Sequence, residues 1–137
     1  RHTPEIEQEL SVLSGQPVKV TFTPHLLPIS RGILSTVYAS LTPGFTEKDI
    51  SELYRKQYCA EPFIRLLKED EFPATQYVRG SNFCDISFKI DPATKRIIVM
   101  STIDNIVKGA SGQAVQNMNI MCGFAETAGL EIVPLFP

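Results

Sequence analysis

The fold is decided by the stretch CDISFKIDPATKRIIVMSTI, which runs from Cys84 to Ile103. In its first half apolar and polar side chains alternate, which is the period of a half-buried β-strand. Its second half, from Ile97 onward, is strongly apolar. The residues between the halves, Asp91 to Lys95, include the proline and polar side chains typical of a turn. We therefore expect two antiparallel strands joined as a hairpin.

Two helices are indicated upstream of this hairpin. Thr3 can cap the first, with Pro4 at its first position, and Gly15 is a C-terminal stop. The second begins after Thr46, which forms a capping-box pattern with Asp49. The expected core positions are Ile6, Leu10 and Leu13 in the first helix, and Ile50, Leu53, Tyr54 and Tyr58 in the second.

Strands are expected between these helices. Val18 to Phe22 alternates like a half-buried strand, and Gly32 to Leu41 is apolar on both faces. A short strand follows the second helix. The resulting order of helix, strand, strand, helix, short strand, hairpin and helix predicts an α+β fold, with a mixed or antiparallel sheet and helices packed on one face.

The last helix, from about Val107 to Phe124, begins with small residues. Gly109 and Gly112 each cost a helix about 1 kcal/mol relative to alanine. Small residues at a helix start suit a partner that comes close to the backbone. That partner is either another helix or a ligand drawn to the free N–H groups and the positive end of the dipole, and these residues leave both interpretations open.

The composition excludes only a few classes of protein. The 137 residues are 43% apolar and 20% charged, which is typical of one globular domain. The net charge of −2 gives no electrostatic signature for nucleic acid. No apolar run approaches the ~20 residues of a membrane span. We therefore expect neither a nucleic-acid nor a membrane partner.

The cysteines and histidines are sparse. Cys59, Cys84 and Cys122 have no C-x-x-C spacing, which argues against a disulfide framework. So few cysteines are typical of a protein in a reducing compartment. Free cysteine is most often a small buried hydrophobe, and we expect this of all three. Two well-separated histidines, His2 and His25, argue against a metal site.

The run from Asp104 to Ala110, continued from Gly112 to Met118, resembles the last helix of the N-acetyl-gamma-glutamyl-phosphate reductase family of arginine biosynthesis. The resemblance spans the chain in order. The other matching segments are Arg1 to Glu7, Phe22 to Leu26, Arg31 to Ile33 and Arg79 to Asp85. Aspartate-semialdehyde dehydrogenase is a more distant relative with a similar Asn-x-x-Lys-Gly-Ala run, but residues 82–85 speak against it.

The resemblance implies a fold like the C-terminal domain of glyceraldehyde-phosphate dehydrogenase. Residues 1–137 would form a substrate-binding and dimerisation domain, with the last helix (about 106–124) facing an N-terminal dinucleotide-binding domain. The family's glycine-rich dinucleotide turn and its nucleophilic cysteine in a Cys-Tyr-Pro segment do not occur here. We therefore expect this chain to be inactive alone, and to act with NADP on an acyl phosphate in a homo-oligomer. The expected location is the cytoplasm, or a plastid or mitochondrion after removal of a transit peptide.

The resemblance also implies site residues. His2 would assist the cysteine as a general acid or base, oriented by Glu5 or Glu7. The expected substrate-binding residues are His25, Arg31, Arg79, Ser81 and Asn82. The expected cofactor-binding residues are Lys108, Gly109, Ala110, Gly112, Gln113 and Asn117.

Two other functions compete with this one. The chain could be a non-catalytic binding or oligomerisation module with the same fold, or a domain of an aspartate-semialdehyde dehydrogenase-like enzyme. None of the three cysteines has a histidine within six residues. A nucleophilic thiol needs a lowered pKa and access to substrate, so we predict that this chain carries no catalytic thiol.

Overall fold

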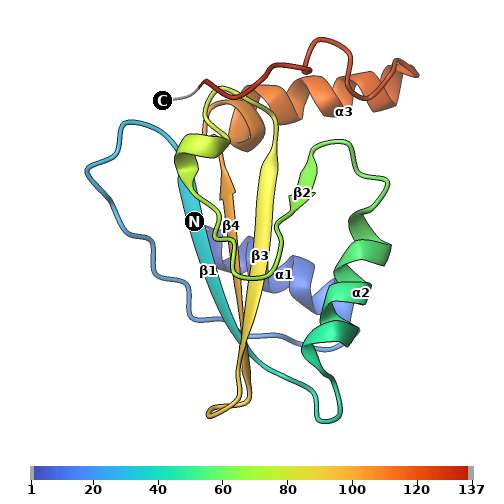
Figure 1. The fold of residues 1–137 in the computed structure, drawn as a ribbon. Coiled ribbons are helices and arrows are strands. Elements are labelled where there is room, and N and C mark those ends of the chain that lie inside the picture. Colours follow the sequence, from blue (N-terminus) through green and yellow to red (C-terminus); the bar gives the residue numbers. More distant parts are fainter. Residues whose placement is uncertain (1, 136–137) are drawn as a thin grey trace.

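The computed structural model describes residues 2–135, which form a sheet of strand order β1-β4-β3-β2 with helices around it (Figure 1). The strands are β1 (Ile33–Ser40), β2 (Ile64–Leu66), β3 (Cys84–Asp91) and β4 (Arg96–Ile103). The helices are α1 (His2–Ser14), α2 (Glu47–Tyr58) and α3 (Gly112–Cys122), with a 3-10 turn η1 (Thr75–Tyr77) and a π-helical turn η2 (Val107–Ser111).

The predicted hairpin is the centre of the sheet. β3 and β4 pair antiparallel from Cys84 opposite Ile103 to Asp91 opposite Arg96. β1 pairs antiparallel with the other side of β4, and β2 pairs parallel with β3. The α+β class with a mixed sheet is therefore confirmed.

The two faces of the sheet differ in chemistry. The α2 helix contacts the apolar face, where Tyr54 stacks on Phe88 with ring centroids 5.4 Å apart. On the opposite face β3 carries polar side chains, and the chain between β2 and β3 runs across the sheet in front of this face (Figure 1). Asp85, Ser87 and Thr102 are buried there.

Helix boundaries follow the signals in the sequence with small shifts. The capping box of Thr46 and Asp49 is formed at the start of α2. Gly15, at φ 69°, follows the end of α1, and Gly123, at φ 73°, ends α3 in the left-handed conformation that favours glycine. The described part of α1 already includes His2 and Thr3, so Thr3 lies inside the helix rather than at its cap.

The strand expected over residues 18–22 is wrong. Side chains of α1 take up the backbone donors that a ladder would use. The Val18 N–H donates to Ser11 Oγ at 2.9 Å, and the Val20 N–H donates to Glu7 Oε1 at 3.2 Å. The segment is held against the helix and forms no strand.

Burial expectations also need correction. Cys59 and Cys122 are exposed, and Cys84 is only partly buried. The apolar stripe of α1 is uncovered, since the helix buries none of its described residues and Leu13 is 83% exposed. In α2, Ile50 is buried as expected but Leu53 is not. Several of these apolar positions are therefore covered only in part by the described chain.

Besides α1, the elements β1 and α3 carry exposed apolar side chains. Every residue of β1 is exposed, Tyr38 to 64%. In α3, Met118, Ile120 and Met121 are exposed. Monomeric proteins rarely expose large contiguous apolar surface. Among the described helices, none has the length and apolar character needed to cross a membrane.

Candidate functional site

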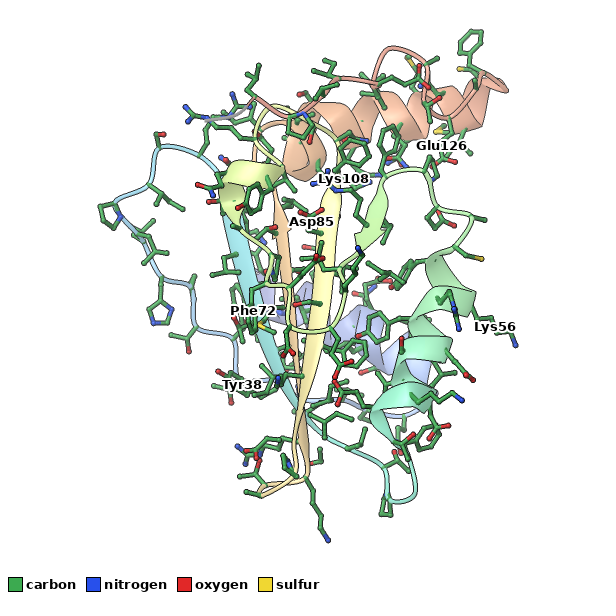
Figure 2. All side chains as sticks on the ribbon, in the orientation of Figure 1. Tyr38, Lys56, Phe72, Asp85, Lys108 and Glu126 are labelled. Carbon is green, nitrogen blue, oxygen red and sulfur yellow. The ribbon has the colours of Figure 1, made fainter. Side chains whose placement is uncertain are left out.

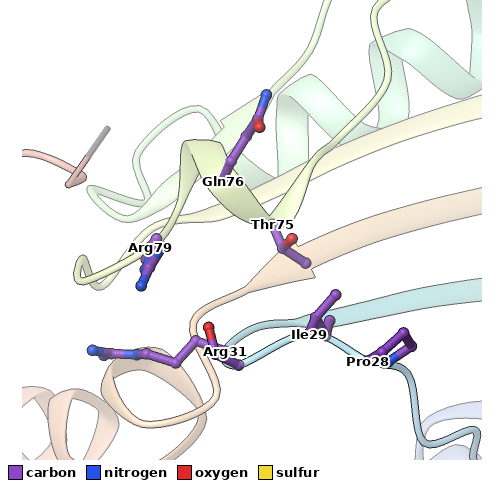
Figure 3. A pocket seen from close by; sticks show the side chains of 7 residues that line it. Pro28, Ile29, Arg31, Thr75, Gln76 and Arg79 are labelled. Carbon is purple, nitrogen blue, oxygen red and sulfur yellow. The ribbon is translucent and has the colours of Figure 1, made fainter. Parts of the chain in front are cut away.

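An open hollow with a volume of about 290 Å³ lies at one end of the sheet, beside the start of β1 (Figure 3). It is lined by Pro28, Ile29, Ser30, Arg31, Thr75, Gln76 and Arg79. Arg31 extends beneath Arg79 in this view, while Thr75 and Gln76 come from η1. Two arginines with hydroxyl and amide groups are suited to a ligand that carries carboxylate or phosphate.

Arg31 is held by a buried carboxylate. One of its Nη atoms lies 2.8 Å from Asp104 Oδ2, and Asp104 has no exposed surface. The Arg31 Nε is buried and has no hydrogen-bond partner among residues 2–135. The guanidinium is therefore held by Asp104 through an Nη atom, while its Nε is enclosed and has no acceptor among the described residues.

Asp104 also binds three backbone N–H groups. The same Oδ2 accepts from Gly80 at 2.7 Å, and Oδ1 accepts from Ile106 at 2.8 Å and Val107 at 2.9 Å. Burial alone raises the pKa of Asp104, but the donors from Gly80, Val107 and Arg31 outweigh it and hold the pKa at about 2. The side chain is thus ionised at neutral pH and links three segments of the chain.

The turn after Asp104 is π-helical. The Gly109 N–H donates to the Asp104 carbonyl at 2.9 Å, and the Ser111 N–H donates to the Ile106 carbonyl at 2.9 Å. π-helical turns are rare and frequently occur at functional sites. Gly109 and Ala110 are exposed on this turn, so a ligand could reach the backbone there.

A polar network lies beneath α3, where Lys108 and Glu126 are seen in Figure 2. Gln116 Oε1 accepts from Lys108 Nζ at 2.7 Å and from Asn82 Nδ2 at 2.9 Å, and Gln116 Nε2 donates to Glu126. Burial lowers the pKa of Lys108. Asn82 therefore joins the expected cofactor side rather than the two arginines.

Other expected substrate residues lie apart from the hollow. Ser81 is fully buried, and its hydroxyl donates to the Val78 carbonyl at 2.7 Å, which stabilises the turn before β3. His25 is exposed, with Nδ1 3.0 Å from the Thr23 carbonyl, and does not line the hollow. The structure thus brings together Arg31 and Arg79 from this group.

His2 is exposed at the start of α1, and its ring makes an edge contact with Phe22 at 6.3 Å. Glu7 bonds Lys19 at 2.7 Å and the backbone of Val20, and the lysine lowers the pKa of Glu7. Because Glu7 is engaged in this way, Glu5, one helical turn from His2, is the better candidate for orienting it.

The remaining cofactor candidates differ among themselves. Gln113 Nε2 donates to Asn117 Oδ1 at 2.9 Å on the surface of α3. Gly112 is buried, and a methyl group there would lie 2.7 Å from Val107 Cγ1 and closer still to Asn82 Oδ1. The small size of Gly112 is therefore required by packing within the chain.

Sequence reasoning missed several residues of the site. Asp104 and Asn105, whose Oδ1 accepts from the Gly32 N–H at 2.7 Å, stood in the recognised motif without a role. An aspartate just before a helix start is a capping signal that could have found Asp104. Gln116 and Glu126 had no local signal, because their partners are distant in sequence.

Burial raises the pKa of the Cys84 thiol, while nearby Lys108 opposes this. A raised pKa is the reverse of what a nucleophilic thiol requires. The geometry therefore agrees with the absence of a catalytic thiol at Cys84.

These features define a class of protein, an α+β domain with a candidate anion-binding site at one end of its sheet. The family model for the semialdehyde dehydrogenase dimerisation domain matches residues 1–105, and the chain belongs to this family.

Similar proteins of known name agree with this family assignment. The chain is 67% identical over all 137 residues to an N-acetyl-gamma-glutamyl-phosphate reductase of Desulfotalea psychrophila, and 61% identical to that of Pelobacter propionicus. It spans 40% of the length of each and matches their C-terminal part. The crystal structure of aspartate semialdehyde dehydrogenase II from Vibrio cholerae, complexed with ASA, matches with a TM-score of 0.66 at 18% identity. That match covers 90% of this chain and 37% of the other and shows a shared fold.

Proposed function

We propose that this chain is the C-terminal substrate-binding and dimerisation domain of an NADP-dependent N-acetyl-gamma-glutamyl-phosphate reductase of arginine biosynthesis, acting in the cytoplasm. The observation that carries the proposal is identity of 67% and 61% along the whole chain to reductases of that name. The complete enzyme would reduce the acyl phosphate to a semialdehyde. In this proposal the nucleophilic cysteine and the dinucleotide-binding domain come from another part of the polypeptide.

The substrate would bind at the hollow. An acyl phosphate with an additional carboxylate carries two anionic groups, and Arg31 and Arg79 both line this space. Arginine binds such groups through a planar fork of donors. The exposed part of the Arg31 side chain, 28% of its surface, would donate to one of them.

NADPH would supply the hydride when bound. The residues present fit a nicotinamide cofactor in part, because Gly109 and Ala110 expose backbone on the π-helical turn, whereas Gly112 is closed by its own neighbours. Gln113 and Asn117, paired on the surface of α3, would offer amide groups beside this turn.

His2 would hold or move a proton at the substrate carbonyl oxygen, with Glu5 as the candidate orienting carboxylate. An exposed histidine can serve either as acid or as base near neutral pH. Its exposure at the start of α1 leaves it accessible to groups from another domain.

The exposed apolar side chains support two proposed interfaces, one with the dinucleotide-binding domain and one with a second copy of the chain. Ile120 and Met121 on α3 are exposed and would contact the dinucleotide-binding domain. The uncovered residues of β1, such as Val37 and Tyr38, fit a second copy of the chain in a homo-oligomer.

The test uses the full-length reductase that contains this chain, assayed with N-acetyl-gamma-glutamyl phosphate and NADPH. We expect turnover, and we expect His2→Asn to lower kcat/KM by about 10²–10⁴-fold. His25→Asn is the matched control, because neither histidine lines the hollow and both are exposed, but only His2 is given a role in proton transfer. Absence of turnover in the wild-type protein would favour the non-catalytic module, and an unchanged His2→Asn variant would remove His2 from the mechanism.

A further inference from the structure

The two oxygens of Asp104 serve opposite sides of the candidate site. Oδ2 faces the substrate side, where it accepts from Arg31 at 2.8 Å and from the Gly80 N–H at 2.7 Å. Oδ1 faces the cofactor side, where it accepts from the N–H groups of Ile106 and Val107 that begin η2. One side chain without exposed surface thus contacts both halves of the site.

The next residue, Asn105, holds the backbone on the substrate side of the site. Asn105 Oδ1 accepts from the Gly32 N–H at 2.7 Å, so consecutive residues hold the side chain of Arg31 and the backbone that follows it. A free arginine side chain has several rotatable bonds and loses about 2 kcal/mol of rotamer entropy when fixed. Asp104 fixes the guanidinium before any ligand arrives.

The same carboxylate places the second arginine. Its bond to Gly80 holds the turn at φ 76°, next to Arg79, which lines the hollow with Arg31. The backbone carbonyl of Arg79 in turn accepts from Leu135 at 2.8 Å. The relative position of the two arginines therefore depends on Oδ2 of Asp104.

We propose that Asp104 is a positioning residue that aligns Arg31 and the Arg79 turn for the anionic groups of the substrate, while separately fixing the first turn of η2 for the cofactor. This inference rests on the proposed function. Asp104 has no exposed surface and acts through the two arginines. Pre-aligned donors bind better than donors that must be ordered by the ligand.

The substitution Asp104→Asn should affect the substrate side of the site and spare the cofactor side. The amide can keep one oxygen toward the N–H groups of Ile106 and Val107, which cannot move away because they belong to the backbone. Its NH₂ group then faces Arg31, whose side chain is 28% exposed and can swing out toward solvent. The substitution therefore releases Arg31 on the substrate side but leaves the backbone of Ile106 and Val107 in place on the cofactor side.

A matched control is available in Asp85. It is 2% exposed and pairs with Arg65 Nε at 2.6 Å, so it is also a buried aspartate held by an arginine. Asp85 lies on β3, and neither it nor Arg65 lines the hollow (Figure 2). Arg65 also donates to the Tyr77 carbonyl of η1 at 2.8 Å, but it touches neither Arg31 nor the Arg79 turn, so Asp85→Asn should lower thermal stability while affecting ligand affinity much less than Asp104→Asn.

The experiment compares the full-length wild type, Asp104→Asn and Asp85→Asn. For Asp104→Asn we expect KM for N-acetyl-gamma-glutamyl phosphate to rise by about tenfold to a hundredfold. The Kd for NADPH, from fluorescence titration, should change by less than about twofold, because the contacts of η2 are retained. For Asp85→Asn both constants should stay within about threefold of the wild type, because Arg31 and the Arg79 turn keep their contacts to Asp104.

Several outcomes would overturn the inference. Equal weakening of substrate and cofactor in Asp104→Asn, or equal KM changes in the two aspartate variants, would reduce Asp104 to a purely structural residue. If Asp104→Asn does not fold, Arg31→Lys keeps a positive charge on the carboxylate but removes the guanidinium fork, and an unchanged KM there would also refute the inference. An inactive wild type would overturn the proposed function and this inference with it, whereas an active wild type with an unchanged KM in Asp104→Asn would overturn this inference alone.

Discussion

Replacing Gly112 with alanine should destabilise the chain even though alanine favours helices. A methyl group at this position would lie 2.7 Å from Val107 Cγ1 and 2.8 Å from the Val107 carbonyl oxygen, and closer still to Asn82 Oδ1. The carbonyl is backbone and Asn82 is 1% exposed, so neither can move aside cheaply. Helix propensity would contribute about 1 kcal/mol in favour of alanine, against an overpacking cost of about 1–3 kcal/mol.

Gly109 is the matched control for this substitution. A methyl group there would meet the Asp104 carbonyl oxygen and Ile103 Cδ1 at 3.4 Å, which is close to ordinary van der Waals contact. We expect Gly109→Ala to leave the free energy of unfolding within about 1 kcal/mol of the wild type. Because the contacts at residue 112 lie below 3 Å, its overpacking cost should fall near the upper end of the range, so that Gly112→Ala lowers the free energy of unfolding by about 2 kcal/mol after the propensity gain.

The assay is urea-induced unfolding of the 137-residue chain followed by circular dichroism, with the dependence on urea checked for equality among the three proteins. A Gly112→Ala variant as stable as the wild type would refute the packing explanation. In the full-length reductase, Gly109→Ala should weaken NADPH binding if the cofactor approaches the exposed backbone of η2. Unchanged binding would remove Gly109 from the cofactor site.

Two further predictions concern ionisable groups. Because the folded-state pKa of Asp104 is about 2, against an ordinary value of 3.8, its ionisation stabilises the fold by about 2.5 kcal/mol above pH ~5, and this stability is lost as the pH falls below 3.8 through about 2. The destabilisation caused by Asp104→Asn should therefore shrink by about 1 kcal/mol between pH 6 and pH 3 in urea titrations, and a constant difference would contradict the assignment. Replacing Cys59, Cys84 or Cys122 with serine in the full-length reductase should leave turnover intact, and loss of activity from any one, with folding preserved, would place the nucleophile in this chain.

Local patterns in the sequence predicted much of the fold. The alternation in β3, the turn at residues 91–95 and the capping box of Thr46 each depend on neighbours within a few residues, and each formed as expected. The residues 18–22 show the limit of this reasoning. Their alternation is that of a strand, but side chains of Ser11 and Glu7 bind their backbone donors instead.

The candidate site was only partly predictable. The resemblance singled out Arg31 and Arg79, and the structure places both at one hollow. It also singled out Ser81, which is buried and bonded within its own turn. A sequence motif marks that a segment matters, but it does not tell which side chains of that segment face a ligand.

The sequence by itself determined the α+β class, the hairpin at its centre and the family, because periodicity, capping and motif order are written along the chain. Only the tertiary structure decided the role of Asp104, which joins residues 31, 80, 106 and 107 through one buried carboxylate. The tertiary structure also showed that Asn82 bonds Gln116 and that Gly112 is required for packing within the chain. It showed further that α1 and β1 leave apolar surface uncovered. These facts depend on contacts between segments far apart in sequence, and no local pattern records such contacts.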